Sequence, residues 1–122
     1  MKWYIDNNKP VYIQLVEQLK SKIVSGEFKA GDKIDSVRSL AEEAQVNPNT
    51  MQKALVELER QGLVFSKRTS GRFVTDNEEM IKFMKEELAV NEIKNLKTNL
   101  ERLGFNKEEI IDLVICNIKG EN

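Results

Sequence analysis

Apolar residues recur every three or four positions along most of this chain, the spacing that gathers them on one face of a helix. In the first half, this pattern predicts three helices, over about residues 10–25, 35–44 and 47–61. Pro10 suits a first helical turn, and Gly26 and Gly62 are suited to end the first and third helices. Because only Gln45 and Val46 separate the second helix from the third, these two helices are expected to form a helix-turn-helix.

Two short runs rich in β-branched and aromatic residues follow the third helix, Leu63–Lys67 and Arg72–Thr75. Residues 68–71 lie between them and have turn character, which predicts a β-hairpin. A basic hairpin directly after a helix-turn-helix is the wing of a winged helix. We therefore expect an α+β fold, mainly α, with a winged helix-turn-helix of three helices and a hairpin over residues 1–75.

Residues 76–122 carry two further helical patterns, and we expect them to form a helical dimerisation tail. Gly104 ends the first of these helices, and Asn106 with Glu109 has the spacing of a capping box for the second. Two helices alone cannot bury both apolar faces, so a second copy of the chain is the expected cover. The residues expected in this dimer interface are Ile93, Leu96, Leu100, Leu103, Ile111, Val114, Ile115 and Ile118.

Two other expectations concern this tail. The apolar stripe from Ala89 to Leu103 has an alternative interpretation, an ordinary core seam within one chain. Cys116 lies among isoleucines and is expected to be a small buried residue.

The start of the third helix carries side chains suited to a nucleic-acid surface. Asn47 can cap this helix, and Pro48 occupies its first position. The next polar side chains are those of Asn49, Thr50, Gln52 and Lys53. A side-chain amide can pair bidentately with adenine, so the amides at positions 49 and 52 are candidates for reading bases, with a plain solvated helix face as the alternative.

Basic residues near this helix are candidate phosphate contacts. These are Lys53, Lys67, Arg68 and Arg72, which would supply affinity and salt dependence more than sequence information. The whole chain has a net charge of −1, but residues 1–75 hold 12 Lys and Arg against nine Asp and Glu. Residues 76–122 hold seven against 11. The positive charge is therefore concentrated in the segment expected to bind nucleic acid.

Composition argues against catalysis, metal binding and membrane insertion. The chain has no histidine and one cysteine, which removes His-based nucleophile pairs, a disulfide within the chain and a thiolate zinc site. Neither a GxGxxG nor a GxxxxGK[ST] phosphate loop is present. No apolar run approaches the ~20 residues that span a bilayer, and the N-terminus lacks the apolar core of a signal peptide. We expect a cytoplasmic protein that is not an enzyme and uses no cofactor or metal.

Five segments, in order, resemble the DNA-binding domain of GntR-family bacterial transcription regulators. They are Pro10–Leu15, Gly26–Ile34, Ser36–Ala41, Val46–Thr50 and Leu58–Val64. The resemblance covers roughly residues 3–75. The short two-helix tail resembles the YtrA-type branch, which lacks a large effector domain. The resemblance implies a repressor, and a two-fold homodimer would require a roughly palindromic operator of double-stranded DNA.

The resemblance also implies which residues contact DNA. The family's contacts fall on Arg38, on the start of the third helix, and on Gly71 of the wing with its basic neighbours. The full expected set is Ser36, Arg38, Asn47, Asn49, Thr50, Gln52, Lys53, Lys67, Arg68, Gly71 and Arg72. Three positions depart from the family pattern: Asp35 stands where proline is usual, Gln45 where glycine is common, and Thr69 where the wing often has its first glycine.

Other interpretations remain open at the level of sequence. Winged helices also serve as protein-docking domains, although such a module would not need amides and cations gathered at one helix start beside a basic wing. Arg38 could be a solvated residue paired with Glu42. An unidentified small-molecule effector would be expected at the dimer interface or between the winged-helix head and the tail, because the tail has little room for an enclosed pocket.

Overall fold

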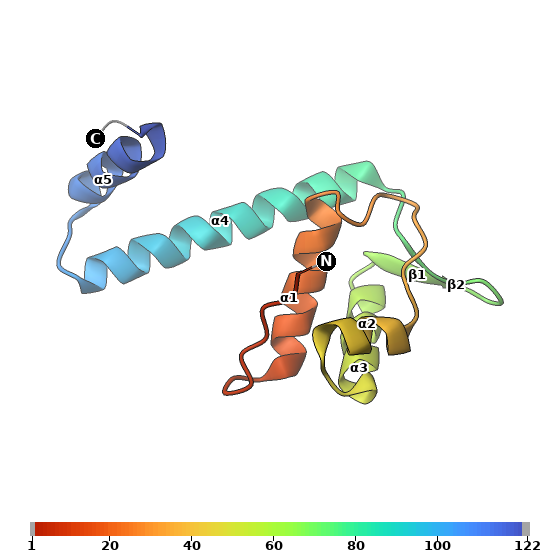
Figure 1. Cartoon of the computed structure of the whole chain (residues 1–122). Helices are drawn as coiled ribbons and strands as arrows, with labels where there is room; N and C mark the ends of the chain where they lie inside the picture. The colour runs from red at the N-terminus through yellow and green to blue at the C-terminus, as the bar shows by residue number, and fades with distance from the viewer. Residues whose placement is uncertain (1, 121–122) are drawn as a thin grey trace. The chain divides into compact units, whose positions relative to one another are not determined.

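The computed structural model describes residues 2–120, and these residues form five helices and one two-stranded antiparallel sheet (Figure 1). The elements are α1 (Val11–Val24), α2 (Val37–Ala44), α3 (Pro48–Arg60), β1 (Val64–Lys67), β2 (Gly71–Val74), α4 (Glu78–Arg102) and α5 (Lys107–Lys119). The predicted order of elements and the mainly helical α+β class are confirmed.

The chain divides into two compact units, one ending at Lys85 and the other beginning at Glu86. We call them the head and the tail. The boundary falls within α4, so the first two turns of that helix belong to the head. The sequence pattern placed the division earlier, after residue 75, because it marked the start of α4 and not the packing of its first turns.

The core of the head is built from the apolar faces of α1, α2 and α3 together with the strands. Its fully buried side chains include Leu15, Leu19, Leu40, Met51, Leu55, Leu58, Leu63 and Val74. Ile81 and Met84 of α4 pack against this core, as do Trp3 and Ile5 of the N-terminal segment. Burial of these large apolar side chains is the main force holding the three helices together.

The wing pairs Val64 with Val74 and Lys67 with Gly71 across the hairpin. The segment before α2 adds to it, because Ile34 N–H donates to the Arg72 carbonyl at 2.9 Å and Val74 N–H donates to the Asp32 carbonyl at 2.8 Å. The sequence predicted only a turn-rich connector here. The connector instead lies along β2, which ties the wing to the start of α2.

The tail consists of the rest of α4 and α5. Asn106 accepts a hydrogen bond from Glu109 N–H at 2.9 Å and donates from its own N–H to the Glu109 carboxylate at 2.8 Å, so the expected capping box is present. Only Ile110 is buried among the described tail residues. Cys116 is exposed, so the expectation that it is buried was wrong: one pair of helices cannot cover this face of α5.

None of the helices within residues 2–120 combines the length and apolar character needed to cross a membrane.

Candidate nucleic-acid interface

The turn between α2 and α3 is held by a left-handed residue. Gln45 has φ 56° and ψ 51°, and it is the only non-glycine residue with positive φ in the described chain. Val46 N–H donates to the Ala41 carbonyl at 3.0 Å and closes the end of α2. This conformation explains why glycine suits the position, since a side chain in the left-handed region is strained.

Helix α3 begins as the sequence predicts. The Asn47 side chain accepts a hydrogen bond from Asn49 N–H at 2.8 Å, and Pro48 occupies the first helical position. Asn47 is therefore a helix cap, whatever else it contacts. Met51, Ala54, Leu55 and Leu58 are buried beneath this helix.

The polar side chains on the outer face of α3 are available for an external partner. Asn49 and Gln52 are exposed, and within residues 2–120 their side chains make no hydrogen bond. Thr50 is half-buried. Lys53 is exposed, and its Nζ lies 5.5 Å from the centre of the Tyr12 ring, which orients the ammonium by a cation–π contact. Farther along α3, the Arg60 guanidinium is paired with the Glu57 carboxylate.

Arg38 lies in the first turn of α2 and is exposed. If Arg38 were an ordinary solvated residue, its expected partner would be Glu42. The described structure shows no ion pair between these two residues. Ser36, by contrast, is occupied as the cap of α2: its hydroxyl accepts from Ser39 N–H at 3.1 Å. Of these two expected DNA contacts, only Arg38 has a side chain without an internal partner in residues 2–120.

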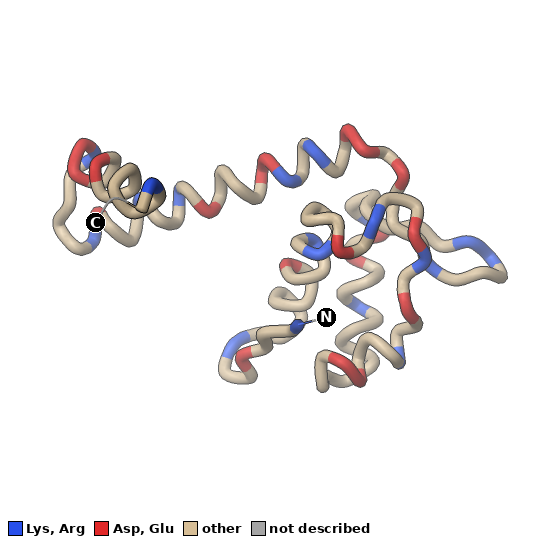
Figure 2. Tube along the Cα trace, turned by 45° about the horizontal axis from the view of Figure 1, so that its top comes forward, with Lys and Arg blue, Asp and Glu red and all other residues tan. Residues whose placement is uncertain are grey.

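The wing carries its basic residues on different faces. Lys67 lies over the stacked rings of Phe65 and Phe73, with its Nζ 4.6 Å from the centre of the Phe73 ring. Arg68 is exposed in the turn, where Figure 2 shows positive charge gathered along the hairpin. Both cations are placed where a polyanion could reach them.

Arg72 makes an ion pair within the head. Its side chain is only 19% exposed, and its guanidinium is paired with Glu59 of α3. Ser66 donates to the same Glu59 oxygen at 2.8 Å. The hydrogen bond from Arg72 lowers the pKa of Glu59 and keeps that carboxylate charged. Glu59 therefore fixes the wing to α3, a role that sequence reasoning missed because the partners are far apart along the chain.

A groove of about 630 Å³ separates the start of α2 from the wing turn. It is lined by Lys33, Ile34, Asp35, Ser36, Val37, Thr69, Ser70, Gly71 and Arg72. Asp35 and Thr69, two of the positions that depart from the family pattern, thus line the same groove. Gly71 has φ 101°, and a Cβ there would lie 3.2 Å from Cε of Lys33, so this residue shapes the groove through its backbone.

The three helices, the αL turn and the hairpin fixed to α3 define a winged helix-turn-helix domain, the class used by DNA-binding transcription regulators. The family described as "Bacterial regulatory proteins, gntR family" matches residues 11–74. The chain belongs to this GntR family.

Two curated relatives come from Bacillus subtilis. The uncharacterized HTH-type transcriptional regulator YhcF is 34% identical over 106 residues, covering 87% of this chain and 88% of the relative. The HTH-type transcriptional repressor YtrA is 41% identical over 71 residues, covering 58% of this chain and 55% of YtrA. The resemblance to YtrA-like regulators is therefore confirmed.

Two solved structures are informative. A GntR family transcriptional regulator from Listeria monocytogenes has a TM-score of 0.83 and 37% identity, covering 90% of this chain and 96% of that one. The DNA-binding domain of AraR in complex with operator ORX1 has a TM-score of 0.52 and 29% identity, covering 62% of this chain and 92% of that one. The head thus shares its fold with a domain that binds operator DNA.

Proposed function

We propose that this chain is a sequence-specific DNA-binding regulator that represses transcription as a homodimer on a palindromic operator. The observation that carries the proposal is the set of exposed polar side chains at the starts of α2 and α3. Arg38, Asn49 and Gln52 are exposed, their side chains have no internal partner in residues 2–120, and the same head carries a basic wing.

The roles of these residues follow from their chemistry. With the start of α3 in the major groove, the amides of Asn49 and Gln52 pair with base edges. Arg38, Lys53, Lys67 and Arg68 meet phosphates and set the register of the domain on the duplex. Asn47 and Ser36 build the two helix starts, and Arg72 holds the wing on α3. Thr50 and the backbone of Gly71 are the remaining parts of the surface that contacts DNA in this proposal.

The tail supports the dimer. Eight of the 13 large apolar side chains that are exposed in the described chain lie in the tail, including Ile93 at 64% and Ile118 at 79%. An apolar groove of about 300 Å³ runs between α4 and α5, lined by Ile93, Leu96, Ile110, Ile111, Val114 and Ile115 with Lys97 and Lys107. A core seam within one chain would have buried this stripe. Leaving so much apolar surface in water is unfavourable, so a second copy is the proposed cover.

A two-fold dimer presents two copies of α3 to successive major grooves. The half-sites are then separated by about 10–10.5 base pairs or a multiple of that distance. Binding over a promoter blocks transcription. This function needs no enzymatic step and no cofactor, and it places the protein in the cytoplasm; a small-molecule effector would act on the dimer.

Selection of bound sequences from random double-stranded DNA tests the proposal. We expect enrichment of one palindrome, with affinity falling by about 10³–10⁵ between 50 and 200 mM salt if six to ten phosphates are neutralised. Failure to enrich any sequence would favour the alternative, a winged-helix module that docks proteins. Affinity that stays flat across the salt series would remove the phosphate contacts from the mechanism.

A further inference from the structure

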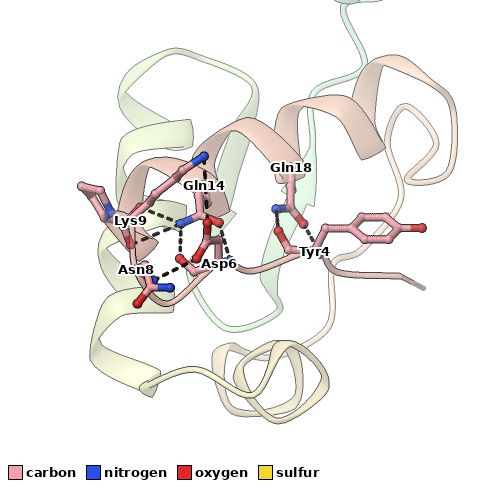
Figure 3. A network of polar contacts seen from close by, with 7 residues as sticks. Tyr4, Asp6, Asn8, Lys9, Gln14 and Gln18 are labelled. Carbon is pink, nitrogen blue, oxygen red and sulfur yellow. Dashed lines mark hydrogen bonds and ion pairs between the residues drawn. The ribbon is translucent and has the colours of Figure 1, made fainter.

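The N-terminal segment of residues 2–9, which we call the arm, is held along α1 by two glutamines (Figure 3). Tyr4 N–H donates to the Gln18 side-chain oxygen at 2.9 Å, and the Gln18 amide donates back to the Tyr4 carbonyl at 2.8 Å. Gln14 repeats this pair with Asp6, with both distances 2.8 Å. Each glutamine thus engages the backbone of the arm as a neighbouring strand would.

A third residue of α1, Lys22, also holds the backbone of the arm. Lys22 is buried, and its Nζ donates to the Lys2 carbonyl at 2.7 Å and lies 4.7 Å from the centre of the Trp3 ring. The positions on α1 are four residues apart, a rise of about 6 Å, and the arm positions are two residues apart, a rise of about 6.6 Å. The two periods match, so one row of side chains on a helix pairs with every second residue of an extended segment.

The alternation of the arm decides where its side chains lie. Tyr4 is 72% exposed, whereas Trp3 and Ile5 pack against the core. Trp3 and Ile5 also line one recess of about 310 Å³ together with Glu43, Ala44 and Gln45. The arm therefore lies beside the turn that joins α2 to α3, and that turn contains the strained residue Gln45.

We propose that the arm buttresses the α2–α3 turn, and that Gln14 and Gln18 are positioning residues for DNA recognition. This inference rests on the proposed function. The left-handed conformation of Gln45 costs free energy that glycine would not pay, so the turn depends on its surroundings to persist. Trp3 and Ile5 supply those surroundings. The hydrogen bonds from the two glutamines to the arm backbone hold Trp3 and Ile5 in place.

Loosening the arm should affect contacts with the bases more than contacts with the phosphates. A base contact requires the amides of α3 to be placed within about 0.5 Å. Phosphate contacts by long, flexible cations tolerate a less defined helix. Loosening the arm should therefore weaken binding to the operator while leaving binding to unrelated DNA nearly unchanged.

The test compares Gln14→Ala/Gln18→Ala with a matched control, Lys2→Ala/Tyr4→Ser, on the selected operator and on a scrambled duplex. The control alters only arm side chains, because the glutamine bonds run to the arm backbone. We expect the glutamine variant to lose about tenfold on the operator, the effect of losing one or two hydrogen bonds between α3 and the bases. It should lose less than about twofold on the scrambled duplex, and the control should bind both DNAs like the unmodified protein. Fluorescence of Trp3, the single tryptophan, should shift in the glutamine variant as the arm loosens.

A second background separates positioning from general stability. In the Gln45→Gly background the turn is relaxed, and the same glutamine substitutions should cost less than about threefold. Gln18→Ala alone provides a milder variant if the double variant unfolds. Equal losses on both duplexes, or equal losses in the control, would overturn the proposal, the latter by showing that arm side chains touch DNA. If the unmodified protein selects no sequence, the proposed function fails before any arm variant is measured.

Discussion

Arg72 of the wing and Glu59 of helix α3 form an ion pair, with the guanidinium Nε donating to a carboxylate oxygen of Glu59. Ser66 donates to the same oxygen from the opposite strand. One acidic residue on α3 thereby holds both strands of the hairpin. The position of the wing on the head is set by this contact and by the connector along β2.

Replacing Glu59 with glutamine should loosen the wing. The amide loses its charge-assisted bond with Arg72, so the free energy of unfolding should fall by about 1–2 kcal/mol. Chemical denaturation followed by circular dichroism measures this change. Glu92→Gln, at an exposed position of α4, is the control and should leave the unfolding midpoint within error. An unchanged midpoint for Glu59→Gln would show that the wing is held by its backbone contacts alone.

Acid should remove the stabilisation that the Glu59 carboxylate gives to the folded head. The folded pKa of Glu57 is lowered from 4.5 to about 2, chiefly by its hydrogen bond with Arg60, and the pKa of Glu59 is lowered chiefly by Arg72. A carboxylate with a lowered folded pKa stabilises the protein above its unfolded pKa and loses that contribution as the pH falls through the folded value. The stability difference between the natural protein and Glu59→Gln should be constant above about pH 5 and shrink below about pH 4.5. Urea unfolding at a series of pH values checks this, and a difference that grows in acid would contradict it.

Arg38→Ala should abolish most operator binding. The exposed guanidinium makes no internal ion pair in the described residues, so its loss should leave thermal unfolding nearly unchanged. A charge-assisted phosphate contact is worth roughly 1.5–3 kcal/mol, which corresponds to about tenfold to more than a hundredfold in affinity. Fluorescence anisotropy with labelled operator measures the loss. A large drop in melting temperature would instead make Arg38 a structural residue.

Charged residues at Leu96 and Leu100 should dissociate the proposed dimer. Leu96→Glu/Leu100→Glu places two carboxylates in an apolar interface, where unpaired charge is strongly unfavourable. Sedimentation velocity should show monomers, and binding to the palindrome should weaken. Ile13→Glu is the control, since Ile13 is an exposed apolar residue of the head and should not alter the mass. Dimers that persist in the tail variant would place the interface elsewhere.

Gln45→Gly should stabilise the head. Relief of the left-handed side chain is worth about 1–2 kcal/mol, and the greater chain entropy of glycine offsets about 0.5–1 kcal/mol of it. The expected net gain is then about 0.5–1 kcal/mol, a rise of several degrees in melting temperature. Gln61→Gly, at a helix end with ordinary negative φ, is the control and should be destabilising.

The sequence alone determined the elements and most of the surface chemistry. Helix periodicity, the caps at Asn47 and Asn106 and the glycine stops are local signals, so they survive without knowledge of the fold. The exposure of Asn49 and Gln52 also follows from the helix period, since Met51 and Leu55 must face the core.

Only the tertiary structure decided how distant residues combine. It paired Arg72 with Glu59, which gives Arg72 a role in the support of the wing, and it placed the arm beside Gln45. It left Cys116 exposed, and it carried the head into the first turns of α4. These outcomes depend on contacts between segments that are remote in sequence, and such contacts are set by packing and hydrogen-bond geometry, which periodicity along one segment does not encode.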